Sequence, residues 1–92
     1  MAKVTPTALG WELLQEYEND PTGLGFLDIE KLLEEWAVIS TLPGQDLVGY
    51  RSRSHPSLPG LHFYYPTLAE LAPPIVLGIC RALRELYRRT ST

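Results

Sequence analysis

The C-terminal quarter of the chain constrains the fold most. Residues 67–89, TLAELAPPIVLGICRALRELYRR, contain the densest apolar block in the sequence together with four of its six arginines. Pro73 and Pro74 cannot donate the hydrogen bonds of a helix interior, but a helix tolerates proline in its first turn. We therefore predict a capped turn over 67–72, followed by a long helix that begins at Pro73 or Pro74.

Apolar residues in this predicted helix recur every three or four positions, which is the spacing of one helical face. The stripe comprises Ala72, Val76, Ile79, Leu83 and Leu86, and Ile75 and Ala82 widen it. Leu77 and Gly78 lie on the opposite side, among the arginines, so the segment 75–80 is apolar nearly all round. Such a segment needs cover on two sides, from its own domain or from a partner.

The totals indicate one small globular domain. A chain of 92 residues buries only about two-thirds of its unfolded surface, so its margin of stability is thin. A hydrophobic share of 45% is high for this size and favours an oligomer or a subunit of a complex. The single cysteine, Cys80, excludes an internal disulfide and is expected to be a small buried apolar residue. Without an apolar secretory segment or a run of transmembrane length, we expect a cytoplasmic protein that does not enter membranes.

Residues 7–18 predict a first helix with Thr7 as its N-cap. Its inward stripe is expected to contain Leu9, Leu13, Leu14 and Tyr17, with Trp11 beside them. Acidic residues gather at its C-terminal end, which is unfavourable to the helix dipole. This placement predicts that Glu16, Glu18 or Asp20 meets a cation from elsewhere in the chain.

A second helix is predicted over residues 28–40, beginning at Asp28. Its apolar face consists of Ile29, Leu32, Leu33 and Trp36, followed by Val38 or Ile39. The sequence Thr-Leu-Pro-Gly at 41–44 is expected to close it.

Residues 46–54 and 61–65 alternate in hydropathy, as the two strands of a hairpin do. The alternation assigns to the core Val48, Tyr50, Leu61, Phe63 and Tyr65, and to the other face Arg51, Arg53, His62 and Tyr64. Between the strands, residues 54–60 are predicted to form an exposed loop. This segment contains two prolines and one glycine and is too long for a tight two-residue turn.

The predicted fold is therefore an α+β single domain over 1–92, in the order helix, helix, β-hairpin, helix. The long C-terminal helix is expected to pack on the hairpin and on the two N-terminal helices, because a two-stranded sheet is not stable alone. The ends, 1–6 and 90–92, are expected to fray.

Charge is divided unevenly along the chain, although the net charge is only −3. Residues 1–46 carry nine acidic residues and two lysines, whereas residues 47–92 carry six arginines and two glutamates. We expect folding to bring the two halves together and neutralise them; the alternative is an acidic and a basic surface.

Arginine beside aromatic rings suits phosphate contact and base stacking. The face of Arg51, Arg53, His62 and Tyr64 is therefore the one candidate site for nucleic acid. Two other interpretations compete with it: a solvated face whose arginines pair with the N-terminal acids, and a contact with a protein partner.

Patterns for catalysis, metals and cofactors are missing from the sequence. The segment Gly-Leu-Gly at 23–25 has neither the third glycine nor the lysine of a phosphate-binding loop. Two histidines and one cysteine do not have the spacing of a metal site, and no serine lies in a nucleophile motif. We therefore expect no enzyme activity, no metal, no cofactor and no small-molecule substrate.

The composition favours a small non-catalytic interaction module, either a homodimer or an accessory subunit, that assembles through its C-terminal helix. Exposed tryptophan and arginine dominate the energetics of many interfaces. The predicted partner-binding residues are Trp11, Trp36, Leu77, Arg81, Arg84 and Arg88. The alternative is a nucleic-acid-binding or regulatory protein that uses the hairpin face.

Overall fold

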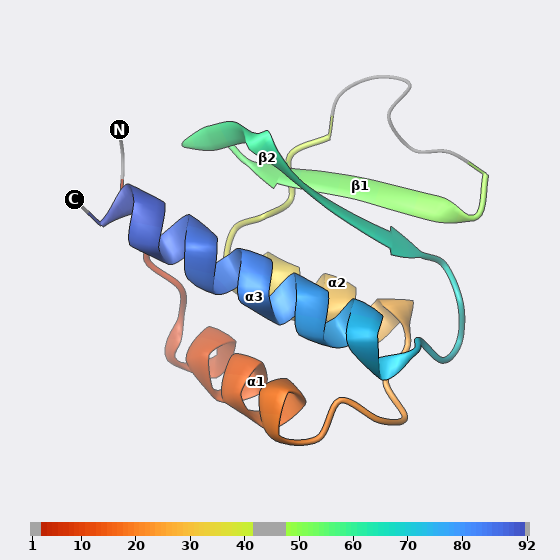
Figure 1. The fold of residues 1–92 in the computed structure, drawn as a ribbon. Coiled ribbons are helices and arrows are strands. Elements are labelled where there is room, and N and C mark those ends of the chain that lie inside the picture. The colour runs from red at the N-terminus through yellow and green to blue at the C-terminus, as the bar shows by residue number, and fades with distance from the viewer. Residues whose placement is uncertain (1–2, 42–47, 92) are drawn as a thin grey trace.

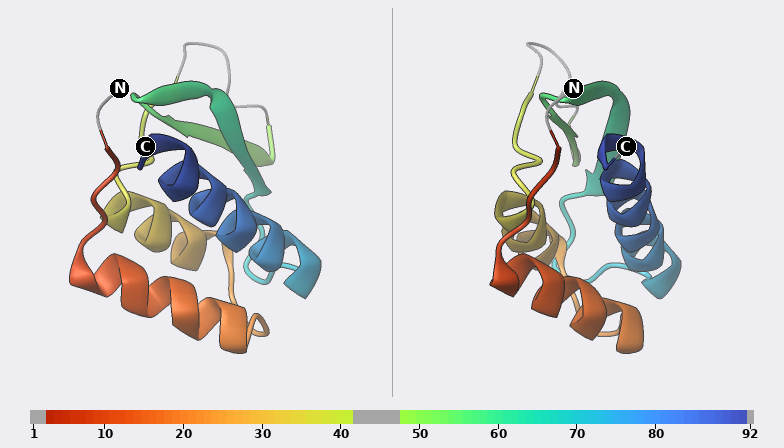
Figure 2. Two further views of the ribbon diagram at one scale, coloured as in Figure 1. Left: turned by 60° about the vertical axis from the view of Figure 1, so that its left-hand side comes forward. Right: turned by 90° about the vertical axis from the view of Figure 1, so that its left-hand side faces the viewer.

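The predicted α+β order is confirmed. The computed structural model describes residues 3–41 and 48–91, which form a small compact domain (Figure 1). Its elements are α1 (Ala8–Asn19), α2 (Phe26–Glu35), β1 (Tyr50–His55), β2 (Leu58–Pro66) and α3 (Pro73–Thr90). Figure 2 shows the hairpin on one side and α1 on the opposite side, with α2 and α3 between them.

The core forms where α3 packs against β2 and α1. The predicted stripe of α3 is buried, apart from Ala72, which is exposed because it is the N-cap of the helix. From β2, Phe63 and Tyr65 reach the same core, each with 1% of its surface exposed. The contribution of α2 to this core consists of Ile29, Leu32 and Leu33.

The two ends of the described chain are tied together rather than frayed. Val4 and Thr90 are both buried, and the Val4 backbone N–H donates to Thr90 Oγ1 at 3.2 Å. Thr90 in turn donates to the Leu86 carbonyl one helical turn earlier. The prediction of fraying over 1–6 and 90–92 is therefore wrong for Val4 and Thr90. Residues 1, 2 and 92 lie outside the described residues.

The N-cap predicted for α1 is confirmed, since Thr7 Oγ1 accepts from the Gly10 backbone N–H at 3.0 Å. The predicted inward position of Leu9 is wrong, because 38% of its surface is exposed. Gly10 takes the buried first-turn position instead, and its carbonyl accepts from Trp36 Nε1 at 3.0 Å. The other predicted members of the stripe, Leu13, Leu14 and Tyr17, are buried as expected.

α2 begins two residues earlier than predicted. Asp28 is the third residue of the helix, and its carboxylate accepts from the backbone N–H of the N-cap residue Gly25 at 2.8 Å, which is the acidic half of a capping box. Gly25 is required here by close approach of the chain. A Cβ at this position would lie 2.2 Å from the Ala69 carbonyl oxygen.

α2 also ends earlier than predicted, at Glu35 rather than at residue 40. Ala37 adopts a φ of 58°, and the Val38 N–H donates to the Leu33 carbonyl at 2.9 Å. These are the features of a Schellman C-cap, with Val38 buried beyond it. Glycine usually occupies the left-handed position of this motif, so an alanine there left no signal in the sequence.

The hairpin turn is tighter than predicted, β2 is longer than the predicted second strand, and β1 begins only at Tyr50. Its strands are joined by the two-residue turn Pro56–Ser57, so the exposed loop predicted over 54–60 is wrong. His55 pairs with Leu58, and a register shift between Arg53 and His55 accommodates the additional residues of β2. Positions 46 and 47 of the predicted first strand lie outside the described residues.

Replacing Ala37 with glycine should raise the free energy of unfolding by roughly 1 kcal/mol. An L-residue in the left-handed region costs about 1–2 kcal/mol, and the greater entropy of unfolded glycine offsets part of that gain. Urea denaturation measures the change. The control, Ala82→Gly inside α3, should lower the free energy by about 1 kcal/mol. A loss in both variants would contradict the Schellman assignment.

Candidate functional site

The predicted arginine–aromatic face is divided between the two sides of the hairpin. Arg51 pairs with Tyr65 and Arg53 pairs with Phe63, and residues paired across two strands lie on the same side. Both arginines therefore share the core-facing side. Tyr64 pairs with Ser52 on the opposite side, and His62 lies beside it, with ring centroids 5.7 Å apart. The constellation proposed for nucleic acid does not exist as one surface.

The prediction that Val48 and Tyr50 face the core is also wrong, because the side of the strand that carries the arginines faces it. Val48 precedes the strand and is fully exposed, and 52% of the surface of Tyr50 is exposed. Ser52 and Ser54 are buried, although Ser52 pairs with Tyr64 on the side opposite the arginines. Alternation within one strand cannot specify which of its sides faces the core when one side carries serines and the other arginines.

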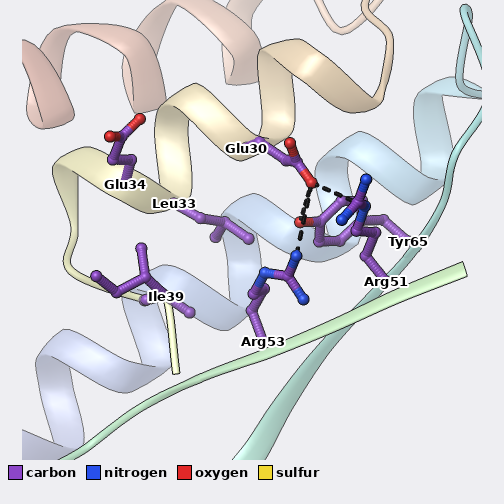
Figure 3. A pocket seen from close by; sticks show the side chains of 8 residues that line it. Glu30, Leu33, Glu34, Ile39, Arg51, Arg53 and Tyr65 are labelled. Atoms are coloured by element: carbon purple, nitrogen blue, oxygen red, sulfur yellow. Dashed lines mark hydrogen bonds and ion pairs between the residues drawn. The ribbon is translucent and has the colours of Figure 1, made fainter. Parts of the chain in front are cut away.

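Glu30 on α2 brings the two arginines together (Figure 3). Its Oε1 atom lies 3.1 Å from Arg51 Nε and 3.8 Å from Arg53 Nη2, and it accepts from the Tyr65 hydroxyl at 3.3 Å. Burial, and then the nearby Glu30 carboxylate, raise the pKa of the Tyr65 phenol, which stays protonated and donates. The cluster ties the hairpin to α2 and pairs basic residues of one half with an acidic residue of the other.

A pocket of about 220 Å³ opens beside this cluster, with Leu33, Val38 and Ile39 among its walls. Its charged and phenolic groups hold one another. Glu30 forms ion pairs with both arginines and accepts from the Tyr65 hydroxyl, and Arg51 also lies over the Phe26 ring, 6.0 Å from its centroid. This arrangement suits a structural tie between two elements and presents no activated nucleophile.

The predicted cation near the acidic end of α1 is confirmed as Arg84 on α3. Arg84 Nε and Nη2 donate to the two carboxylate oxygens of Glu18 at 2.6 and 2.7 Å. These hydrogen bonds lower the pKa of Glu18 and raise that of Arg84. Arg88 is paired with Glu85 on its own helix, whereas exposed Arg81 has no acidic partner among residues 3–41 and 48–91.

The two tryptophans belong to an internal aromatic cluster. Trp36, a predicted partner contact, has only 1% of its surface exposed, so it is unavailable for binding. Trp11 is half-buried and packs edge-to-face on Trp36 and Tyr87, at centroid distances of 4.9 and 5.0 Å. Leu77 is also half-buried and lines a small hollow with Cys80 and Arg81. Of the predicted partner-binding residues, Arg81 is therefore the one that is both exposed and unpaired within the described chain.

A groove between β2 and the N-terminal half of α3 was not predicted as a site. It has a volume of about 360 Å³ and is lined by His62, Phe63, Tyr64, Pro74, Ile75, Gly78, Ile79 and Ala82. We call it the α3–β2 groove. Successive residues 62–64 point to alternate faces of the hairpin, yet all three line it, so it runs along the edge of β2. In the sequence, the only indication of this groove was that Ile75, Gly78 and Ala82 recur at the spacing of one helical face.

Neither the thiol of Cys80 on α3 nor the imidazole of His55 at the hairpin turn is arranged as a catalytic group. Burial raises the pKa of Cys80 to about 11, which keeps the thiol protonated and unreactive. His55 Nδ1 accepts from the Ser57 backbone N–H at 2.9 Å across the turn, and burial lowers the pKa of His55. In the part of the chain that the structure describes, no three His, Cys, Asp or Glu side chains are grouped as metal ligands would be.

No known protein-family model matches this sequence, and neither a curated protein nor a solved structure is significantly similar to it. Among the described helices, none has the length and apolarity needed to cross a membrane.

The Glu18–Arg84 pair makes stability depend on pH. Because the folded-state pKa of Glu18 is lowered, its contribution is present above the unfolded pKa and is lost as pH falls through the folded value. Glu18→Gln should lower the free energy of unfolding by about 0.5–1 kcal/mol at neutral pH, a small amount because the pair is partly exposed, and by less near pH 2. Urea denaturation at both pH values checks this. Glu12→Gln, on the exposed side of α1, is the control and should change neither value.

Proposed function

We propose that this chain is a small non-catalytic protein-interaction module and that the α3–β2 groove is its contact surface. The observation that supports the proposal most is an open groove between a helix and the edge of an aromatic-rich strand. Grooves of this kind bind extended or helical segments of partners in many interaction domains. The proposal keeps the C-terminal helix as the assembling element and moves the contact from its arginines to its N-terminal half.

The side chains around the groove suit burial against a protein. None of its eight lining residues carries a formal charge when His62 is neutral, so covering them removes no ion from water. Half-exposed Tyr64 is of the residue class that is enriched in interfaces. Apolar lining with a few polar ring atoms is the composition expected of a contact surface.

Gly78 gives a second argument. A glycine in a helix interior costs about 1 kcal/mol relative to alanine. A Cβ built at Gly78 would meet nothing within 4 Å, so packing inside this chain does not require the glycine. Close approach of a second molecule would account for it.

The nucleic-acid alternative has less support. Its arginines on β1 are engaged by Glu30, and two of the arginines of α3 are engaged by Glu18 and Glu85. Few cations stay available to displace counterions from phosphate, and the net charge is −3. The cytoplasmic location expected from the sequence stays a prediction.

Site-specific photo-crosslinking tests the proposed surface. With p-benzoylphenylalanine in place of Ala82, which lines the groove, irradiation of producing cells should yield discrete protein adducts. The same amino acid in place of exposed Gln15 on α1 should not. Adducts in equal yield at the two positions, or at neither, would contradict the assignment of the groove as the contact surface.

Fluorescence anisotropy with labelled duplex and single-stranded DNA and RNA tests the alternative. We expect no binding with a negative salt slope, because the hairpin arginines are held by Glu30. Salt-dependent binding that weakens in an Arg51→Ala/Arg53→Ala variant would overturn this expectation and restore nucleic acid as the partner.

A further inference from the structure

We infer that the occupant of the α3–β2 groove is a second copy of this chain, which pairs its β2 antiparallel with the first. The two hairpins would then form one four-stranded sheet across a two-fold axis. This inference rests on the proposed function and names its partner.

The hydrogen-bonding groups of β2 show which edge is open. The Thr67 N–H donates to the Gly49 carbonyl at 2.9 Å, in line with the register of β1 and β2. Bonded pairs alternate along an antiparallel ladder, so Phe63 and Tyr65 bond toward β1. The backbone N–H and C=O groups of His62 and Tyr64 therefore point away from β1, and they have no backbone partner within residues 3–41 and 48–91.

The central part of this edge, between Pro59 and Pro66 of β2, lacks the devices that prevent strands from pairing. Natural edge strands are usually protected by charged side chains, by proline or by a covering element. The segment 61–65, LHFYY, contains no Asp, Glu, Lys, Arg or Pro, and 54% of the surface of Tyr64 is exposed. A copy of the same segment can approach it without meeting a like charge.

The groove selects the register. Its strand wall is centred on Phe63, and a two-fold axis at Phe63 places His62 opposite Tyr64 of the second copy. These are the residues whose backbone groups point outward, so each such pair exchanges two hydrogen bonds. The imidazole and phenol rings also become cross-strand neighbours, an arrangement that stabilises antiparallel pairs.

The helices beneath the strands are compatible with the same axis. Gly78 and Ala82 on α3 present little side-chain bulk, which permits close approach of an antiparallel copy of the helix. If the two helices cross near Ala82, Arg81 of one copy comes within reach of Glu85 of the other. Arg81 is exposed and has no acidic partner in the described part of its own chain. Glu85 already pairs with Arg88 on its own helix, so it would then lie between two arginines, and the contact brings opposite charges together.

Sedimentation equilibrium tests the dimer. The wild-type chain should have about twice the monomer mass of 10.4 kDa, and Tyr64→Pro should have the monomer mass. Proline at this position removes the outward N–H without removing a bond to β1, so circular dichroism should show an intact fold. The matched control, Tyr64→Thr, keeps the N–H and should remain dimeric. The inference would be overturned if the wild type were a monomer, or if the wild type and both variants were all dimers.

Disulfide trapping tests the register in a Cys80→Ala background. Mixed chains carrying His62→Cys and Tyr64→Cys should form a crosslinked heterodimer at least tenfold faster than either chain alone, because the two positions face each other across the axis. Equal rates would overturn the register. A monomeric wild type together with photo-adducts of other mass at position 82 would refute the second copy as occupant and leave the proposed function standing.

Discussion

Burial of the apolar stripe of α3 is the interaction on which the rest of this structure depends. Val76, Leu83 and Leu86 are completely buried, and burying one such side chain contributes about 1.5–3 kcal/mol. Partly exposed ion pairs such as Glu18–Arg84 contribute about 0–1 kcal/mol. The apolar contacts therefore hold the hairpin and α1 on either side of α3, and the ion pairs mainly fix how these elements are oriented.

The ion pairs have a second consequence, which concerns where a partner can bind. Glu30 and Glu18 draw arginines of the C-terminal half onto helices of the N-terminal half, so the charge asymmetry of the sequence is partly neutralised inside the fold. The arginines that seemed available for phosphate are thereby engaged in contacts within the chain. The α3–β2 groove, by contrast, is uncharged. Covering it costs little free energy of desolvation, and backbone groups of β2 point outward beside it.

Two features could not have been predicted because they depend on contacts between elements. Strand register is set by pairing, and in β1 the side that faces the core carries two arginines, which a hydropathy pattern assigns to solvent. Those arginines tolerate the position because Glu30 lies opposite them. The end of α2 is set by a left-handed alanine at position 37, and the burial of Val38 supports that conformation in place of the usual glycine.

The sequence by itself determined the order of elements, the buried face of α3, the N-cap of α1 and the need of Glu18 for a cation, because these follow from helical periodicity and from charge near helix ends. Only the tertiary structure decided that Arg51 and Arg53 face Glu30, that Trp36 is buried and that β2 presents an open edge beside Gly78. The physical reason is range. Periodicity and capping act within a few residues, whereas strand register and the neighbours of a side chain depend on segments that are far apart in the chain.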